Sequence, residues 1–270
     1  MVKVKPIIKW VGAKNQIMDD IINKVPKNFE NYHEIFLGSG SVLINILNNK
    51  EITFKKAYAY DINETLINMF IKIQQDPLIF IQKVTELIDL FNKNDKEAFY
   101  YKTREEYNSI LDKKCVDRCC RFLFLNKTCF RGLYRESSTG RFNVSYGYNK
   151  NPSIMSSDEV LALSKLIQNV SFECLSFKES LKKVSTGDFV YLDPPYVGPN
   201  FIGYTSCGFP DHEPLFKMVN SLPCKFLMSN SNSELVSDSF KNCNIVLINC
   251  KRRINSKNPA ATVDELLVFN

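Results

Sequence analysis

Short apolar runs alternate with amphipathic stretches along most of this chain. Runs with the length of buried strands occur at residues 32–37, 57–61, 170–175, 188–192, 225–229, 245–250 and 263–269. Apolar residues recur with the period of a helix at residues 15–24, 42–48, 63–71, 158–168, 176–184, 212–222 and 233–241. This alternation predicts an α/β fold built on one sheet.

Residues 77–127 depart from the alternation, because helical periodicity continues through the whole stretch. Residues 126–148 then lose it. Their Ser-Ser-Thr-Gly sequence is typical of a turn, which predicts an exposed hairpin or an ordered loop. We therefore expect an α/β domain in two parts, residues 1–75 and 151–270, with a mainly helical insertion at residues 76–150.

Composition narrows the class of protein. The chain has 270 residues, 44% hydrophobic and 24% charged, which is ordinary for a globular protein. We find neither a signal peptide nor an apolar run long enough to span a membrane. The 9 cysteines are scattered, so we expect reduced thiols in an intracellular protein. With only 2 histidines in the chain, we expect Cys115, Cys119 and Cys120 to pack in a core and not to bind a metal.

The positive charge is concentrated in one segment. Residues 96–150 hold 12 Lys and Arg against 6 Asp and Glu, whereas the rest of the chain holds 23 of each. Aromatic residues are interleaved with these basic residues, a pattern typical of a nucleic-acid contact surface. A solvated helical face explains part of the charge, but not Arg131, Arg135 and Arg141 on a loop punctuated by glycine.

The sequence Asp193-Pro194-Pro195-Tyr196 follows the last residues of a predicted strand. Two prolines end a strand sharply, and in open α/β sheets ligands bind at the carboxyl ends of strands. The Asp193 carboxylate and the Pro194 carbonyl suit the two N–H bonds of an aromatic amine, whose lone pair they would free. The Tyr196 ring suits a flat base, a stacking worth about 1–3 kcal/mol. A plain turn with a helix-capping Asp is the alternative.

A second candidate site lies in the first part of the chain. The turn Gly38-Ser39-Gly40-Ser41 joins a predicted strand to a helix and presents backbone N–H groups, although a simple tight turn is the alternative. Asp61 ends the next strand roughly 20 residues later, where an acidic residue binds ribose hydroxyls. A helix N-cap is the alternative for Asp61. Trp10 and Lys14 lie beside a Gly-Ala turn and are further candidates for a site. The alternative is that Trp10 packs in the core and that Lys14 is exposed to solvent.

With these motifs in this order, the chain resembles the Dam-like family of adenine-N6 DNA methyltransferases. The agreement covers Lys9-Trp10-Val11-Gly12-Ala13-Lys14, residues 37–41, Asp61-Ile62-Asn63, Gly132-Leu133-Tyr134-Arg135, Phe142-Asn143-Val144, Asp193-Pro194-Pro195-Tyr196, Ser229-Asn230 and Asp264-Glu265-Leu266-Leu267. The chain departs from the family at Arg131, where Asn is common, and at Ile35, where Pro is usual. The resemblance implies a Rossmann-like methyltransferase sheet that binds S-adenosyl-L-methionine, with a target-recognition domain in the insertion.

The motifs and the resemblance together suggest three groups of site residues. The catalytic group is Asp193, Pro194, Pro195 and Tyr196. The cofactor-binding group is Trp10, Lys14, Phe36, Gly38, Ser39, Gly40, Ser41, Asp61, Ile62 and Asp193. The DNA-binding group is Lys127, Arg131, Leu133, Arg135, Asn143, Arg252, Asn255 and Ser256. In the last group, the resemblance implies that Arg135 reads a base and that Leu133 packs against a base pair.

We therefore expect an enzyme that methylates the N6 amine of adenine in double-stranded DNA, after the base leaves the duplex. Methylation of RNA or of a protein glutamine amide, and an inactive DNA-binding relative, remain alternatives. The expected partner is double-stranded DNA, and a restriction endonuclease that acts separately is a further candidate. We expect a monomer or weak dimer in the cytoplasm or nucleoid, without membrane association, of bacterial or viral origin.

Overall fold

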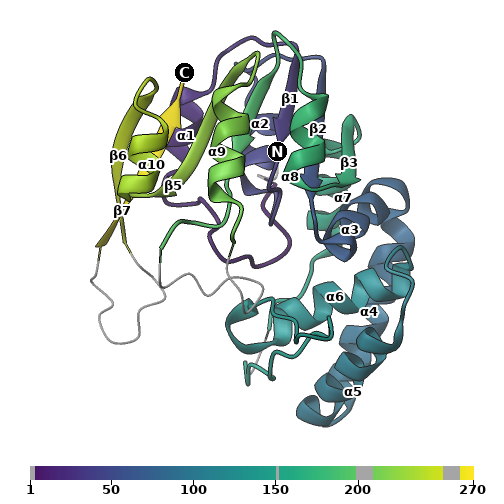
Figure 1. The fold of residues 1–270 in the computed structure, drawn as a ribbon. Coiled ribbons are helices and arrows are strands. Elements are labelled where there is room, and N and C mark those ends of the chain that lie inside the picture. The colour runs from purple at the N-terminus through teal and green to yellow at the C-terminus, as the bar shows by residue number, and fades with distance from the viewer. Residues whose placement is uncertain (1–3, 150–151, 199–208, 252–261) are drawn as a thin grey trace.

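The computed structural model describes residues 4–149, 152–198, 209–251 and 262–270. Its strands form a seven-stranded sheet in the order β3-β2-β1-β4-β5-β7-β6 (Figure 1). The strands are β1 (Asn31–Glu34), β2 (Lys56–Asp61), β3 (Val170–Cys174), β4 (Phe189–Leu192), β5 (Lys225–Ser231), β6 (Asn244–Lys251) and β7 (Thr262–Phe269). The first five are parallel, and β7 lies antiparallel between β5 and β6. The order reverses between β1 and β4, which is where ligands bind in such sheets.

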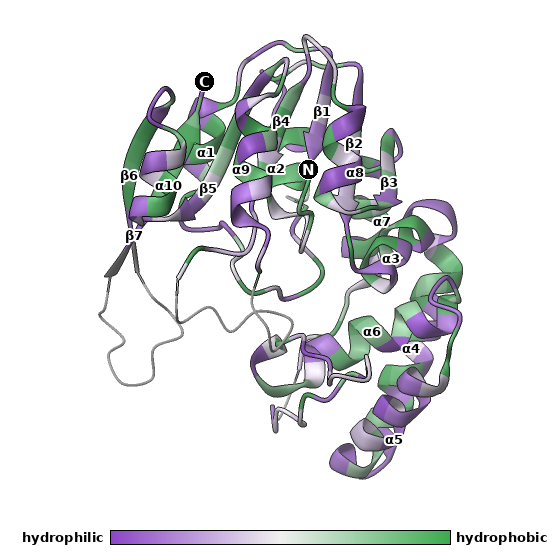
Figure 2. Ribbon diagram, in the orientation of Figure 1, coloured by the Kyte–Doolittle hydropathy of each residue, from purple (hydrophilic) through white to green (hydrophobic). Residues whose placement is uncertain are grey.

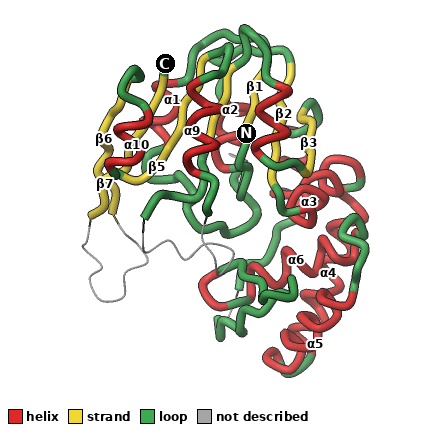
Figure 3. The backbone as a smooth tube through the Cα atoms, viewed as in Figure 1, coloured by secondary structure: helices red, strands yellow, loops and turns green. Residues whose placement is uncertain are grey.

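Helices cover both faces of the sheet (Figure 3). One face packs against α1 (Met18–Lys24), α2 (Ser41–Asn48), α3 (Glu64–Gln75) and α7 (Ser157–Leu166). The other packs against α8 (Phe177–Ser180), the 3-10 turn η2 (Leu181–Lys183), α9 (His212–Asn220) and α10 (Glu234–Ser239). Strands buried on both faces need apolar residues at successive positions, and all of β4 is buried accordingly. The predicted strands and helices are therefore confirmed, with shifted ends; the helix expected from residue 15, for example, begins at Met18.

The insertion consists mainly of α4 (Pro77–Lys93), α5 (Lys96–Ser109) and α6 (Val116–Thr128). These helices lie together on the side of the molecule that the carboxyl ends of the parallel strands face (Figure 1). Most of α6 is buried, whereas α5 is largely hydrophilic and buries only Tyr100, Thr103 and Tyr107 (Figure 2). The helical character predicted for this stretch is confirmed.

After α6 the chain forms the 3-10 turn η1 (Phe130–Gly132) and then an irregular hairpin. The two limbs meet at isolated bridges that pair Cys129 with Tyr146 and Glu136 with Phe142. Phe142 and Tyr146 are 3% and 5% exposed, because the returning limb packs onto the helices of the insertion. The segment is thus an ordered loop, and its second limb buries Phe142, Val144 and Tyr146 while Arg141, Ser145 and Tyr148 remain exposed.

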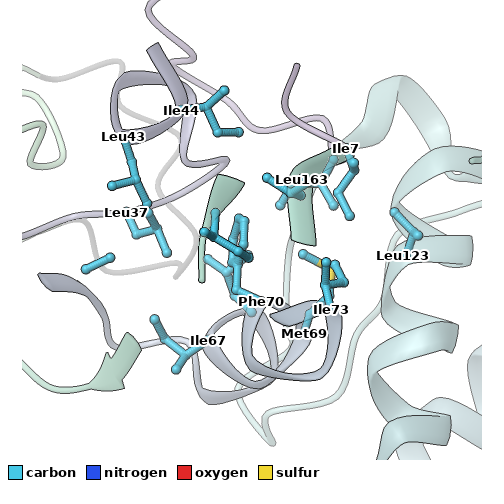
Figure 4. Close-up of a cluster of buried hydrophobic side chains, with 14 of the residues drawn as sticks. Ile7, Leu37, Leu43, Ile44, Ile67, Met69, Phe70, Ile73, Leu123 and Leu163 are labelled. Atoms are coloured by element: carbon cyan, nitrogen blue, oxygen red, sulfur yellow. The ribbon is translucent and has the colours of Figure 1, made fainter. Parts of the chain in front are cut away.

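The hydrophobic core runs without a break from the sheet into the insertion. Figure 4 shows Leu43 and Phe70 beside the sheet and Leu123 of α6 in the same cluster. Cys119 and Cys120 of α6 are also buried in this core, as predicted, whereas Cys115 at the N-cap of α6 is only partly buried and lies outside the core. The division at residues 76–150 remains a prediction, since a common core joins the two parts.

None of the helices in the described ranges has the length and apolar character that crossing a membrane requires. The same ranges contain no group of three or more His, Cys, Asp or Glu side chains arranged to hold a metal ion.

Candidate active site

Two loops meet where the strand order reverses. The turn at residues 38–40 follows β1, and Asp193 follows β4 directly. Tyr32 pairs with Phe189 and Glu34 with Tyr191, so that these two strands end side by side. Backbone hydrogen bonds from Ile35 N to Tyr191 O and from Leu37 N to Tyr60 O continue the alignment beyond β1. The sheet thereby brings the two predicted motifs to one edge.

Lys14 joins the proline turn from the N-terminal segment. Its Nζ lies 2.7 Å from Asp193 Oδ2 and 4.9 Å from the centre of the Tyr196 ring. It also donates to Gly12 O at 2.5 Å. The Lys14 side chain is only 5% exposed, which rules out the alternative of a solvated lysine. Lys14, Asp193 and Tyr196 therefore form one cluster of a cation, a carboxylate and an aromatic ring.

Side chains from β5 and β7 hold the turn at both ends. At its start, Ser229 Oγ donates to Asp193 Oδ1 at 2.8 Å. At its end, Asn230 Oδ1 accepts from Val197 N at 3.1 Å, and Tyr196 donates its hydroxyl to Glu265 Oε2 at 2.8 Å. These side chains fix the turn at both of its ends.

The carboxyl groups at this edge have perturbed pKa values. Burial raises the pKa of Asp193, and Lys14 together with the Ser229 hydroxyl opposes that rise. Burial raises the pKa of Glu34 to about 8, so that this group is neutral at pH 7. Desolvated carboxyl groups with a specific charge partner are typical of functional sites. The Lys14 contact accordingly favours the charged form of Asp193.

Asp61 connects the end of β2 to the glycine turn. Its Oδ2 accepts from Gly38 N at 3.0 Å, and its Oδ1 accepts from Asn63 N at 2.9 Å. The N-cap of α3 is Asn63, whose side chain accepts from Leu66 N, so the N-cap alternative for Asp61 is wrong. Burial raises the pKa of Asp61, and the backbone N–H groups of Asn63 and Gly38 oppose the rise.

Trp10 packs against the same glycine turn. A Cβ on Gly38 would lie 2.7 Å from Trp10 Cδ1, and Gly38 has a φ of +51°, so only glycine fits there. Trp10 also stacks on Tyr134 of the hairpin, with ring centres 5.5 Å apart. Trp10 is partly buried, and its ring lies between the predicted cofactor loop and the insertion.

The other predicted cofactor residues surround this loop. Ser39 and Ser41 are buried, Gly40 has a φ of +69°, and Phe36 packs partly buried against Phe177. Ile62, next to Asp61, is 76% exposed. An exposed apolar side chain therefore lies next to the partly buried Asp61 carboxylate.

The hairpin presents two arginines to solvent. Arg135 donates through Nε to Asn143 Oδ1 at 2.7 Å, which leaves its Nη1 end pointing away from that contact. Arg131 has a φ of +57° and lies over the Phe130 ring at 5.2 Å. Left-handed backbone is unfavourable for a long side chain, and such strain gathers at functional sites. Leu133 is partly buried against the core.

Much of the positive charge of the insertion is used within the fold. Arg118 is 6% exposed and donates to Thr65 Oγ1 and to Tyr107 O. Arg121 pairs with Glu106, and Arg141 pairs with Glu105. The local charge excess therefore overstates the contact surface, and Arg141 in particular has an acidic partner.

Lys127 is partly buried near the end of α6. Burial lowers its pKa, and the neighbouring Lys9 ammonium lowers it further. Among the described residues Lys127 forms no ion pair. Two ammonium groups so close together favour the binding of an anion between them.

Asn126 joins the insertion to the N-terminal segment. Its Oδ1 accepts from Lys9 N at 2.8 Å, its Nδ2 donates to Lys9 O at 2.7 Å, and Nδ2 also reaches Gly132 O at 3.3 Å. Sequence reasoning assigned no role to Asn126, Ser229 or Glu265. The signal available was the polar Ser229-Asn230-Ser231 ending of an apolar strand, at the same sheet edge as Asp193. Arg252, Asn255 and Ser256 lie outside the described residues.

Comparison with known proteins adds independent findings. Residues 10–254 match the family model of D12 class N6 adenine-specific DNA methyltransferases. The chain is 36% identical to the type II methyltransferase M.MjaIII of Methanocaldococcus jannaschii, over 99% of each chain. It is 32% identical to the retron Ec67 DNA adenine methylase of Escherichia coli, over 92% of this chain and 85% of that one. It is 30% identical to the DNA adenine methylase of Escherichia coli strain K12, over 100% of this chain and 96% of that one.

Proposed function

Because the chain belongs to the D12 class of N6 adenine-specific DNA methyltransferases, we propose that Asp193, Pro194 and Tyr196 bind an extruded adenine for methylation by S-adenosyl-L-methionine. The observation that carries this assignment is the cluster of Lys14, Asp193 and Tyr196 at the strand-order reversal. Base pairing blocks the N6 amine in the duplex, so the base must leave the stack before it reacts.

The two hydrogen-bond acceptors of the turn, Asp193 and Pro194, act on the N6 amine of adenine. Its nitrogen is a weak nucleophile while the lone pair is delocalised into the ring. Hydrogen bonds from its two N–H groups to Asp193 Oδ2 and to the Pro194 carbonyl would make the nitrogen tetrahedral and free the lone pair. Among the described residues, no hydrogen-bond donor to the Pro194 carbonyl is seen. Lys14 holds Asp193 Oδ2 and must share this oxygen with the amine or yield it.

Tyr196 orients the base. Its hydroxyl is anchored on Glu265, which limits rotation of the ring. A fixed ring on which adenine stacks places the amine beside Asp193, and such orientation supplies much of an enzyme's acceleration. As the amine attacks, its positive charge develops beside the Asp193 carboxylate, which stabilises that charge.

The residues around the glycine turn fit the cofactor. S-Adenosyl-L-methionine, when bound, supplies an electrophilic methyl group on a sulfonium centre. We assign Asp61 to its ribose hydroxyls, and the exposed Ile62 side chain with Phe36 to its purine ring. The turn at residues 38–41 and Trp10 shape the space between Asp61 and the catalytic turn. The carboxylate beside an exposed apolar side chain supports this fit.

We assign the hairpin and the end of α6 to the DNA. Arg135 can approach a guanine edge with its Nη1 and Nη2 atoms, while Nε stays on Asn143 and Nη2 gives up its long contact to Asn143 O at 3.4 Å. Leu133 and Arg131 lie on the same hairpin, and Lys127 offers its charge to a phosphate. A separate restriction endonuclease and a monomeric or weakly dimeric state remain predictions.

The test uses the whole protein with methyl-labelled S-adenosyl-L-methionine. The substrates are plasmid DNA free of N6-methyladenine, total RNA and a protein mixture, and the labelled product is identified after digestion to nucleosides. We expect N6-methyladenine from DNA only. Asp193→Ala should abolish transfer while DNA binding persists, and Asp238→Ala, an exposed aspartate paired with Lys241, is the matched control.

Each other outcome contradicts part of the proposal. Label in RNA or in protein glutamine would identify a different substrate. Binding of DNA without transfer would indicate an inactive relative. Full activity of Asp193→Ala would refute the role of the turn.

A further inference from the structure

Two buried hydroxyl groups, joined by a hydrogen bond, connect in series to the carboxylate of Asp193. Ser229, on β5, is 0% exposed, and its Oγ lies 2.8 Å from Asp193 Oδ1. The Tyr191 hydroxyl, on β4, lies 3.1 Å from the same Oγ. Leu192 O is the other acceptor near Ser229, at 3.5 Å, which is too long to compete with the carboxylate.

The available protons determine which group donates in each of these two hydrogen bonds. An ionised carboxylate only accepts hydrogen bonds, so Ser229 must use its single hydroxyl proton on Asp193. The proton between Tyr191 and Ser229 must then come from Tyr191. The chain therefore runs from Tyr191 to Ser229 to Asp193, and each donor polarises the next.

The two oxygens of Asp193 are held in different ways. Oδ1 is bound by Ser229, a short and fully buried side chain fixed on a neighbouring strand. Oδ2 is bound by Lys14, which has a long side chain and a second acceptor at Gly12 O. Lys14 can keep the Gly12 contact when it releases Asp193, whereas Ser229 has no comparable alternative among the described residues. Oδ2 is thus the oxygen that is able to change partners.

We propose that Ser229 and Tyr191 are positioning residues, which hold Asp193 Oδ1 so that Oδ2 is presented to the target amine. This inference rests on the proposed function of the turn. Neither residue touches the reacting atoms, and both act through the catalytic carboxylate. A fixed Oδ1 sets the rotation of the carboxylate before the base arrives, which is the preorganisation that catalysis by hydrogen-bond acceptors requires.

The hydrogen bond from Ser229 also affects the protonation of Asp193. The other ionisable groups around Asp193 are Lys14 from the N-terminal segment, Glu34 from β1, Tyr196 from the turn and Glu265 from β7. Burial raises the Asp193 pKa, and of the groups that oppose the rise only Ser229 stays in place once Lys14 has released Oδ2. Loss of the Ser229 hydroxyl should therefore favour the protonated carboxyl, which cannot accept through that oxygen.

The experiment measures single-turnover methyl transfer to unmethylated plasmid DNA across pH 5–9, with saturating S-adenosyl-L-methionine. Ser229→Ala should lower the rate on the order of 10- to 100-fold, the loss expected for a hydrogen bond to a charged group. It should also move the acidic limb of the profile to higher pH. Tyr191→Phe should also lower the rate and move the acidic limb to higher pH, but by less. Ser229→Thr keeps the hydroxyl and should restore the wild-type rate and pH profile.

Controls separate a positioning role from a structural one. Ser180→Ala removes another hydroxyl from a residue that is 0% exposed, on α8, where it donates to Ser176 O and Phe177 O and not to Asp193, and it should leave rate and profile unchanged. Equilibrium binding of cofactor and of DNA should be the same for wild type and Ser229→Ala.

An unshifted acidic limb in both Ser229→Ala and Tyr191→Phe would overturn the inference, even if the rate falls. Because Tyr191→Phe keeps the ring, it decides the question if a Ser229 variant does not fold. Failure of the wild-type protein to methylate DNA would instead refute the proposed function, so the two failures are distinct.

Discussion

Glu34 is a buried carboxyl group whose charge state depends on the fold. It is 2% exposed on β1 and accepts a hydrogen bond from the Tyr32 hydroxyl at 2.7 Å. Burial raises its pKa from 4.5 to about 8, with a smaller contribution from the Asp193 charge. The folded protein therefore binds this proton more tightly than the unfolded chain does. The stability that results is complete below pH 4.5 and is lost as the pH rises to about 8.

We expect Glu34→Gln to remove most of this pH dependence, because glutamine does not ionise and still accepts from Tyr32. The measurement is the free energy of unfolding in urea at pH 5 and at pH 8.5. The decrease between the two should be smaller in Glu34→Gln, by about 1.4 kcal/mol for each unit by which the pKa is raised. The exposed Glu213→Gln is the control. Parallel pH profiles for Glu34→Gln and wild type would show that Glu34 is not neutral in the folded protein.

Arg135 and Lys127 should differ in what they contribute to DNA binding. Asn143 accepts from both Nε and Nη2 of Arg135 and thereby orients the guanidinium, a geometry for reading a base edge. Arg135→Ala should cost about 1–3 kcal/mol on the preferred site and relax discrimination at one base position. Lys127→Ala should weaken binding to all sequences alike and reduce the salt slope by about one unit.

Binding to single-base variants of the methylated site, at two salt concentrations, distinguishes the two roles. The paired Arg141→Ala serves as a control for loss of charge on the hairpin. If Arg135→Ala weakens binding equally on every variant, Arg135 only holds the backbone. Arg131, with its left-handed backbone, is then the next candidate for readout.

At the scale of elements, Asp61 ties β2 to the turn between β1 and α2. Asp61→Ala should weaken binding of S-adenosyl-L-methionine by about 1.5–3 kcal/mol, the range for hydrogen bonds to a charged group. Part of the loss should come through the turn, because Gly38 N also loses its acceptor. Calorimetric titration measures this affinity, and Asn63→Ala, which removes the N-cap of α3, is the control for loosening of the helix. Unchanged affinity in Asp61→Ala would mean that Asp61 only supports the turn.

The elements themselves were predictable because their causes are local. Apolar alternation and paired prolines lie within a few residues of each other, so the strands, the helices and the turn at Asp193 follow from the sequence. The contacts that complete the site are not local. Ser229 reaches Asp193 across 36 residues, Glu265 reaches Tyr196 across 69, and Asn126 reaches Lys9 across 117. Such pairs depend on the strand order, and no period in the chain encodes that order.

At the scale of the molecule, the site is assembled from three parts of the chain. The N-terminal segment supplies Trp10 and Lys14, the sheet supplies Asp61 and Asp193, and the insertion supplies the hairpin. The continuous core keeps the insertion against the sheet. The N-terminal segment contacts both of the others, Asp193 through Lys14 and the insertion through Lys9.

The two hydrogen bonds between Asn126 and the Lys9 backbone have a thermodynamic consequence. The segment that they fix continues into Trp10 at the proposed cofactor loop, while Asn126 stands next to Lys127 at the proposed DNA face. If ordering this segment favours both ligands, each must raise the affinity of the other by the same factor. We expect S-adenosylhomocysteine to tighten DNA binding and DNA to tighten S-adenosylhomocysteine binding equally. Asn126→Ala should bring that factor towards one.

Asn108 offers a matched comparison, because it bonds both backbone atoms of Phe142 in the same two-point manner but within the insertion. Asn108→Ala should leave the factor intact, and an undiminished factor in Asn126→Ala would refute the link. Where the factor is large, an enzyme that holds spent cofactor also holds its DNA longer. The same two hydrogen bonds would then determine how many sites the enzyme methylates before it leaves a given DNA molecule.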